Sequence, residues 1–170
     1  MAAEPSTLHE AARAGNISRM NDFLDEENVD VDAKDELGRT PLHYVAESGE
    51  AAAGALLVEC DATVNIADQD GNTPLHITAI HNRRLVTSML LWGGAEVELT
   101  NNKGNTALHE AAASGAKDVA WLILENGKCD SIKDMRNADG KVPLQVAKEA
   151  EKVNQALIQV LETGQHVDDN

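Results

Sequence analysis

Histidine is the residue type whose spacing first suggests chemistry in this sequence. His9, His43, His76 and His109 recur at nearly equal intervals along the chain, and imidazole is both a common zinc ligand and a general base. Two imidazoles on one zinc ion lie within about 4 Å of each other, whereas packed helices in successive layers lie ~8–10 Å apart. If each histidine belongs to its own structural unit, the four cannot share a metal. We expect each imidazole to hydrogen-bond the backbone of a turn and to tie neighbouring units together.

A zinc peptidase is the second chemistry to consider. His9-Glu10 and His109-Glu110 match the first half of a His-Glu-x-x-His helix, but Arg13 and Ala113 stand where the second histidine is required. The sequence also lacks Gly-x-Ser-x-Gly, a Walker-type phosphate loop, a dinucleotide fingerprint and Cys-x-x-Cys. It therefore predicts no catalytic, metal or cofactor site, and an enzyme remains the weakest alternative.

Composition narrows the class of partner. The 170 residues carry a net charge of −15 with a pI near 4.6, which disfavours binding to nucleic-acid phosphates or to anionic membranes. This charge suits either general solvation or attraction to a basic partner, and the sequence leaves both open. Aromatic residues make up 2% of the chain and apolar residues 42%, which favours a core of small aliphatic side chains.

Three features predict an intracellular protein of the cytoplasm or the nucleus. Met1 to Pro5 show neither the basic start nor the apolar core of a signal peptide. No run of 18 apolar residues could span a membrane. Cys60 and Cys129 fall two structural units apart, which exceeds the ~4.4–6.8 Å between Cα atoms that a disulfide allows, so we expect both thiols to be reduced.

The units themselves are defined by a repeated stretch, Asp70-Gly71-Asn72-Thr73-Pro74-Leu75-His76. Related stretches lie one period earlier, at Gly38 to His43, and one period later, at Gly104 to His109. Glycine permits the positive φ of a tight turn. Thr73 suits a helix N-cap, Pro74 suits the first helical position, and Leu75 begins a buried face. Each unit is therefore predicted to be a turn, a cap and a helix. The period is 33 residues, and a fixed period of this length is typical of stacked repeats.

This Thr-Pro-Leu-His motif, with its preceding Asp-x-Gly or Asp-Gly turn and its period of 33, resembles the ankyrin repeat family over nearly the whole chain. The resemblance implies an all-α solenoid of helix–turn–helix units with β-turn or hairpin tips. It also implies that the motif histidines tie adjacent repeats together, and that a partner protein binds to the concave face and the turn tips.

We expect one domain over residues 1–163, with repeats at about 4–34, 35–67, 68–100, 101–136 and 137–163, and a disordered tail at 164–170. The first and last repeats lack parts of the motif, as terminal repeats commonly do. In the fifth, Val142 replaces the capping threonine and Gln145 replaces the histidine, and polar outward residues are expected to cap the stack. The turn before it is longer by three residues, which predicts a loop insertion between Gly127 and Gly140.

The surface residues predicted to bind a partner occupy two kinds of position. Those at the turn tips are Glu36, Leu37, Arg39, Gln69, Asp70, Asn72, Asn102, Lys103 and Asn105, with Ala138, Asp139 and Lys141 in the last repeat. Those on the exposed flanks of the inner helices are Glu47, Ser48, Ile80, His81, Ala113 and Ser114, with Arg13 in the first repeat. Leu37 and Ile80 are apolar at positions that are usually exposed, and they are read either as partner anchors or as stray exposed aliphatics.

The two tryptophans suggest a second surface. Trp92 and Trp121 are predicted to lie on outer helices of adjacent repeats, at positions that are normally polar and four apart in the repeat. They could form one convex patch with the stems of Arg84 or Lys117, for a partner or for self-association. The alternative is two independent, partly buried rings.

The sequence therefore predicts a non-catalytic protein-interaction module: an adaptor, an assembly chaperone or an inhibitor. The alternatives are an acidic scaffold that recognises a basic protein, self-association through Trp92 and Trp121, and a designed repeat protein without a partner. Irregularities such as Asn82 in place of glycine and Ala107 in place of proline favour natural drift over design. We expect a monomer or weak self-association.

Overall fold

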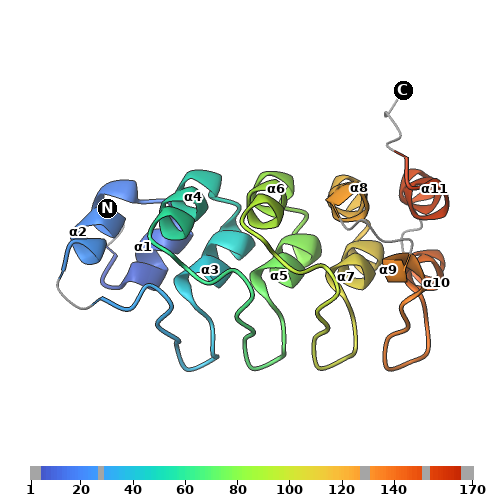
Figure 1. The fold of residues 1–170 in the computed structure, drawn as a ribbon, viewed down its shortest axis with the longest axis horizontal. Coiled ribbons are helices and arrows are strands. Elements are labelled where there is room, and N and C mark those ends of the chain that lie inside the picture. Colours follow the sequence, from blue (N-terminus) through green and yellow to red (C-terminus); the bar gives the residue numbers. More distant parts are fainter. Residues whose placement is uncertain (1–4, 27–28, 127–130, 151–153, 166–170) are drawn as a thin grey trace.

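The computed structural model describes residues 5–26, 29–126, 131–150 and 154–165. Within these residues the chain forms helices joined by extended loops, and the helices stack side by side along one axis (Figure 1). The helices are α1 (Leu8–Ala14), α2 (Ile17–Leu24), α3 (Pro41–Ser48), α4 (Ala51–Glu59), α5 (Pro74–Ile80), α6 (Arg84–Trp92), α7 (Ala107–Ser114), α8 (Lys117–Asn126), α9 (Ser131–Asp134), α10 (Pro143–Glu149) and α11 (Gln155–Thr163).

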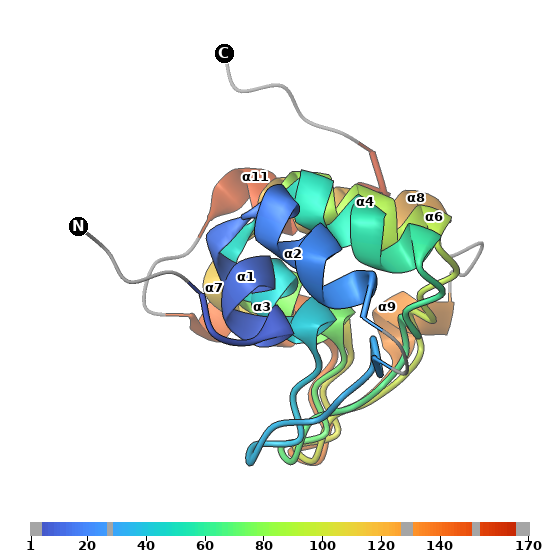
Figure 2. The ribbon, with the colours of Figure 1, turned by 90° about the vertical axis from the view of Figure 1, so that its left-hand side faces the viewer.

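Two layers of helices and a row of fingers make up the stack. The inner helices α1, α3, α5, α7 and α10 form one layer, and the outer helices α2, α4, α6, α8 and α11 form the other (Figure 1). Figure 2, an end-on view, shows the loops between repeats projecting as fingers across the direction of the helices. The fingers and the inner helices therefore line an inner angle, whereas the outer helices face away from it. This arrangement confirms the predicted all-α repeat solenoid.

Local sequence explains where the helices begin and end. Thr40, Thr73 and Thr106 are the N-caps of α3, α5 and α7, each in a capping box with the histidine three residues later. The inner helices are followed by left-handed backbone, at Gly49 (φ 91°) and at Asn82 (φ 53°). Asparagine is tolerated there because its side chain is small and polar, as the sequence predicted.

The core is built from the same helix positions in successive repeats. Leu42, Leu75 and Leu108 of the inner helices are at most 1% exposed, and Leu57, Leu90 and Ile123 of the outer helices are fully buried, each one repeat period from the next. Small residues let two outer helices approach closely. A Cβ atom added at Gly54 would lie 2.4 Å from Cε of Met89, so the cost of glycine in α4 is offset by packing against α6.

The insertion before the last repeat differs from the loop that the sequence predicted. Part of it forms the four-residue helix α9, which buries Ile132 completely, and Met135 packs against the core beside it. The extra residues therefore extend the core, because an aliphatic side chain is available to cover the end of the fourth repeat.

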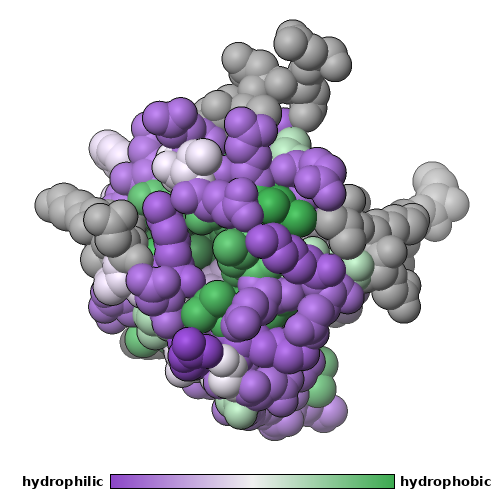
Figure 3. Space-filling model, turned by 90° about the vertical axis from the view of Figure 1, so that its right-hand side faces the viewer, coloured by the Kyte–Doolittle hydropathy of each residue, from purple (hydrophilic) through white to green (hydrophobic). Residues whose placement is uncertain are grey.

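The exposed side chains of α10 and α11 are polar, as expected for a cap, and half-buried apolar side chains lie among them. Figure 3 looks onto this end of the stack, where hydrophobic side chains gather in the middle of a hydrophilic surround. Between α9, α10 and α11 lies a hollow of about 280 Å³ lined by Val142, Pro143, Leu144 and Leu161, with charged residues at its edge. Helix α11 begins at Gln155, after its N-cap Asn154. Cys129 and residues 166–170 of the predicted tail lie outside the described residues. No described helix is long and apolar enough to cross a membrane.

Candidate protein-interaction surface

Each finger is a tight turn fixed by its first residue, an aspartate or asparagine. In the third repeat, Oδ1 of Asp68 accepts hydrogen bonds from the backbone N–H groups of Asp70 (3.0 Å) and Asn72 (2.8 Å). Asp35, Asn101 and Asn137 make the same pair of bonds in their fingers. Because the side chain of the first residue satisfies these N–H groups, the residues at the tip can vary without unfolding the turn.

Neighbouring fingers are joined through their backbones. The N–H of Gln69 donates to the carbonyl of Leu37, that of Asn102 to the carbonyl of Asp70, and that of Ala138 to the carbonyl of Lys103, each at 3.0 Å. Two predicted partner-binding side chains also take part, since the amides of Gln69 and Asn102 donate to carbonyls of the preceding finger at 2.7 and 2.9 Å. These two amides support the row of fingers, a role that the sequence reading missed.

The motif histidines join each repeat to the next. Nδ1 of His76 accepts from the backbone N–H of Thr73 at 3.3 Å, so its Nε2 carries the proton and donates to the carbonyl of Asn105 at 2.9 Å. His43 and His109 make the equivalent bonds to Thr40 and Asn72 and to Thr106 and Lys141. His9 likewise lies 3.2 Å from the carbonyl of Arg39 through Nε2. The predicted role of these histidines between repeats is confirmed.

These imidazoles are not arranged for acid–base or metal chemistry. His43, His76 and His109 are at most 1% exposed, and burial lowers the pKa of each, although their hydrogen bonds to carbonyls act in the opposite direction. Both ring nitrogens of each are engaged, so neither is open to a substrate. Among the described residues no three His, Cys, Asp or Glu side chains come together as a metal site.

A second side-chain link, absent from the sequence reading, joins the finger to the inner helix in the second and fourth repeats. The Tyr44 hydroxyl donates to Asp35 at 2.7 Å; this hydrogen bond, with burial, raises the pKa of Tyr44. At the equivalent positions of the fourth repeat, the Asn101 amide donates to Glu110 at 2.9 Å. In the second repeat the helix supplies the donor and the finger supplies the carboxylate. In the fourth repeat the finger supplies the donor and the helix supplies the carboxylate.

Charged residues of the first three repeats form a paired cluster. Arg39 contacts Glu47 at 3.1 Å and Asp68 at 3.7 Å, and Arg13 contacts Glu47 at 3.5 Å. The guanidinium carbons of Arg13 and Arg39 lie 5.9 and 5.8 Å from the centre of the Tyr44 ring. Arg39 and Glu47 are half-buried and satisfy each other, so part of their charge is used within the fold.

The remaining predicted residues fall into two groups by exposure. Exposed on the fingers and inner helices are Glu36, Leu37, Gln69, Asp70, Ile80, His81, Asn102, Lys103, Ala113 and Ser114, whereas Arg39, Glu47, Ser48, Asn72 and Asn105 are half-buried. Leu37 is 53% exposed and Ile80 is 38% exposed. Ser114, although exposed, donates to the carbonyl of Ala79 in the preceding repeat at 2.8 Å. Whether these residues bind a partner stays a prediction.

Two depressions lie where fingers meet inner helices. One, of about 320 Å³ in the first two repeats, is lined by Thr7, His9, Glu10, Arg13, Asp35 and Tyr44. The other, of about 280 Å³ in the last two, is lined by Asn105, Ala113, Asn137, Asp139, Lys141, Val146, Glu149 and Ala150. Both mix carboxylates with a cationic side chain and are shallow surface features, which suits contact with a macromolecule better than enclosure of a small ligand.

The two tryptophans have different environments. Trp92 at the end of α6 is 95% exposed, whereas Trp121 on α8 is half-buried and packs against the core. A groove of about 260 Å³ beside Trp92 is lined by residues of α6 and α8, and Trp121 is not among them. Lys117, whose stem was expected to join the patch, is buried. The structure therefore separates the exposed ring from the half-buried one.

A family model and several known proteins match this chain. A family model described as ankyrin repeats matches residues 8–100 and 79–170. Cortactin-binding protein 2 is 32% identical over 65 residues in Plecturocebus moloch and 34% identical over 65 residues in Oryctolagus cuniculus, which is 38% of this chain and 4% of each relative. Delta-latroinsectotoxin-Lt1a of Latrodectus tredecimguttatus is 38% identical over 61 residues, 35% of this chain and 5% of the toxin. The chain thus spans about a twentieth of the length of these relatives. Two family matches that together run from the first inner helix through the last repeat, on a structure with capped helix pairs and hydrogen-bonded fingers, show that this chain belongs to the ankyrin repeat family.

Proposed function

We propose that this chain is a non-catalytic adaptor, assembly chaperone or inhibitor that binds a partner protein in the angle between its fingers and inner helices. Ankyrin repeats are in general protein–protein interaction modules and are typically non-catalytic. The observation that carries the proposal is the exposure of two aliphatic side chains, Leu37 at 53% and Ile80 at 38%, among the fingers and inner helices. Covering such a side chain contributes about 1.5–3 kcal/mol.

The fingers further suggest that the partner is basic. Among the described residues, Glu36, Asp70 and Asp139 have no ion-pair partner, and all three are exposed at finger tips. Lys103 is an exposed cation at one tip, whereas Arg39 and Lys141 are neutralised by Glu47 and by a short contact with Glu149. Among the described residues, unpaired acids therefore outnumber unpaired cations at the tips. An acidic rim on a chain of net charge −15 steers a cationic surface toward it and makes association sensitive to salt.

Affinity capture from the source cell tests this proposal. The double variant Leu37→Ser/Ile80→Ser should lose the captured protein, whereas Leu85→Ser, a 68% exposed leucine on outer helix α6, should retain it. Capture by the wild type should also weaken as salt is raised. Equal capture by all three proteins would show that the fingers and inner helices are not the binding surface.

A further inference from the structure

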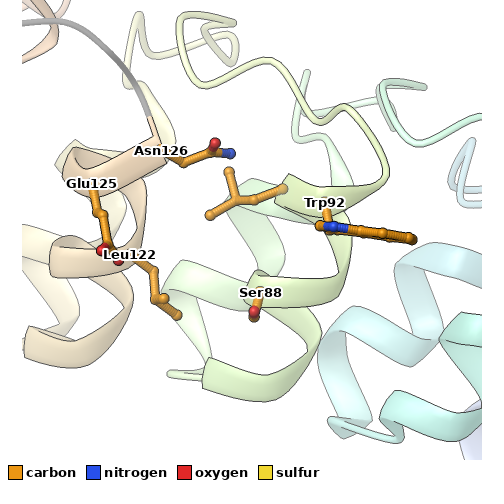
Figure 4. A pocket seen from close by; sticks show the side chains of 6 residues that line it. Ser88, Trp92, Leu122, Glu125 and Asn126 are labelled. Carbon is orange, nitrogen blue, oxygen red and sulfur yellow. The ribbon is translucent and has the colours of Figure 1, made fainter.

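The outer face of the third repeat carries an aromatic ring that the fold does not use. Trp92 is 95% exposed and stands in the register that Glu59 occupies in the preceding repeat and Glu125 in the following one, one repeat period away on each side. Outer helices α4, α6 and α8 pack in sequence, so the position of Trp92 on α6 has an exposed carboxylate at the matching position of each neighbouring helix. Figure 4 shows the ring edge-on, projecting from the end of α6 away from α8.

Two adjoining hollows continue from this ring. The first, of about 260 Å³, is lined by Ser88, Leu91, Trp92, Leu122, Glu125 and Asn126, and its side chains from α6 and α8 face each other in Figure 4. The second, of about 400 Å³, shares Leu91 and Asn126 and adds residues 94–98. Together they form an outer groove with an apolar floor at Leu91 and Leu122.

The described residues that line the outer groove include the acids Glu96, Glu98 and Glu125, and none of them is lysine or arginine. Glu98 has another interaction in the fold, so Glu96 and Glu125 are the acids open to a ligand. Helix α6 ends here, at Trp92, and the C-terminal end of a helix carries a partial negative charge. A cation is therefore favoured on this surface, while the floor favours an aliphatic side chain.

We propose that the outer groove is a second docking site, which binds a short arginine-containing segment of a partner protein. A guanidinium stacks on an indole face and pairs with carboxylates, and it does so better than an ammonium group. An arginine of the segment would lie on Trp92 on the side of Glu59, a neighbouring leucine-sized side chain would enter between Leu91 and Leu122, and the next arginine would meet Glu125. This site lies on the opposite layer from Leu37 and Ile80, so it is independent of the interaction proposed above.

The test uses labelled hexapeptides and the full chain. The probe alternates arginine and leucine; its controls replace leucine by serine, which keeps the charge, or arginine by glutamate. We expect the probe to shift the indole N–H signal of Trp92 in a ¹H–¹⁵N correlation spectrum. By fluorescence anisotropy, Trp92→Ser and Glu125→Lys should each weaken its binding about tenfold or more, as loss of an interface anchor does, and both controls should bind more weakly than the probe.

Two controls test whether the probe binds specifically to the outer groove: a variant on the other face, and a measurement that the Trp92 variant is folded. Leu37→Ser should leave probe binding unchanged, and circular dichroism should show that Trp92→Ser is folded. Equal binding to wild type and Trp92→Ser, or equal binding of the arginine–serine peptide, would overturn the proposal in favour of non-specific attraction to an acidic protein. Sedimentation that shows a dimer abolished by Trp92→Ser would overturn it in favour of a second copy of this chain.

Discussion

The buried histidines predict a specific dependence of stability on pH. His43, His76 and His109 are at most 1% exposed and have lowered pKa values because burial disfavours the imidazolium. Below the ordinary pKa of about 6.5, the unfolded chain binds protons that the folded chain does not, so stability falls as pH falls. Each histidine contributes a slope of up to about 1.4 kcal/mol per pH unit, or about 4 kcal/mol per unit for the three. Most carboxylates titrate below pH 5, so the window from 6.5 to 5 reports on the histidines.

His76→Gln separates the hydrogen bonds of the ring from its titration. In the last repeat, Oε1 of Gln145 accepts from the backbone N–H of Val142 at 3.0 Å, so glutamine can keep the cap. It should lose the bond to the carbonyl of Asn105, which costs about 2 kcal/mol at pH 7.5 if that buried acceptor is left unpaired. Because glutamine does not titrate, the deficit should shrink by up to about 1.4 kcal/mol per unit below 6.5, and the two stability curves should meet near pH 5.

Urea unfolding followed by circular dichroism at half-unit steps from pH 7.5 to 5.0 measures both curves. His81→Gln is the matched control, because the His81 side chain is exposed and has no hydrogen bond among the described residues; its curve should run parallel to that of the wild type. If His76→Gln also ran parallel to the wild type, the buried imidazole could not be the source of acid sensitivity, and the reasoning would be wrong.

Three further predictions concern the fingers and the outer face. Gly71 and Gly115 both have positive φ, but a Cβ at Gly71 would meet a backbone nitrogen of the next finger at 2.7 Å, whereas Gly115 faces open space. Gly115→Ala should therefore lower the free energy of unfolding by about 1 kcal/mol, and Gly71→Ala should lower it by at least about 1 kcal/mol more. Equal losses of stability in urea unfolding would contradict this. Asn101→Asp should destabilise by about 2 kcal/mol because it sets a carboxylate against Glu110, and adding Glu110→Gln should recover at least half in a double-mutant cycle; a neutral single variant would refute the pairing. Trp92→Ser should change the free energy of unfolding by less than about 0.5 kcal/mol, and a larger loss would mean that this ring supports the fold.

Local chemistry made most of this fold predictable. A turn glycine, a capping threonine, proline at the first helical position and leucine on the buried face act within a few residues of one another, so the sequence alone places α3 and α5 closely. Asn82 could be read as a left-handed substitute for glycine for the same reason. The predicted role of the histidines in joining repeats is confirmed by their bonds to carbonyls of the next repeat.

Features that depend on contacts between distant residues were not predictable. The exchange of donor and acceptor between Asp35–Tyr44 and Asn101–Glu110 spans nine residues in each case, and it becomes visible only when the repeats are compared in register. Ile132 was read as part of a loop because a single aliphatic residue carries no periodicity, yet it is fully buried in the structure. Such burial is decided by the shape of the preceding repeat.

The residues that hold neighbouring repeats together differ from those that can bind a partner, because the links between repeats use mainly backbone atoms and the motif histidines. Fingers are joined by backbone N–H and C=O groups, and each motif histidine bonds a backbone carbonyl, so the side chains of Glu36, Asp70 and Lys103 are not needed for either link. Gln69 and Asn102 are different, because their side-chain amides take part. Substitutions at the first three positions should therefore alter binding while stability is retained, whereas substitutions at the other two should alter both, and an interaction surface can diverge at the first three without rebuilding the fold.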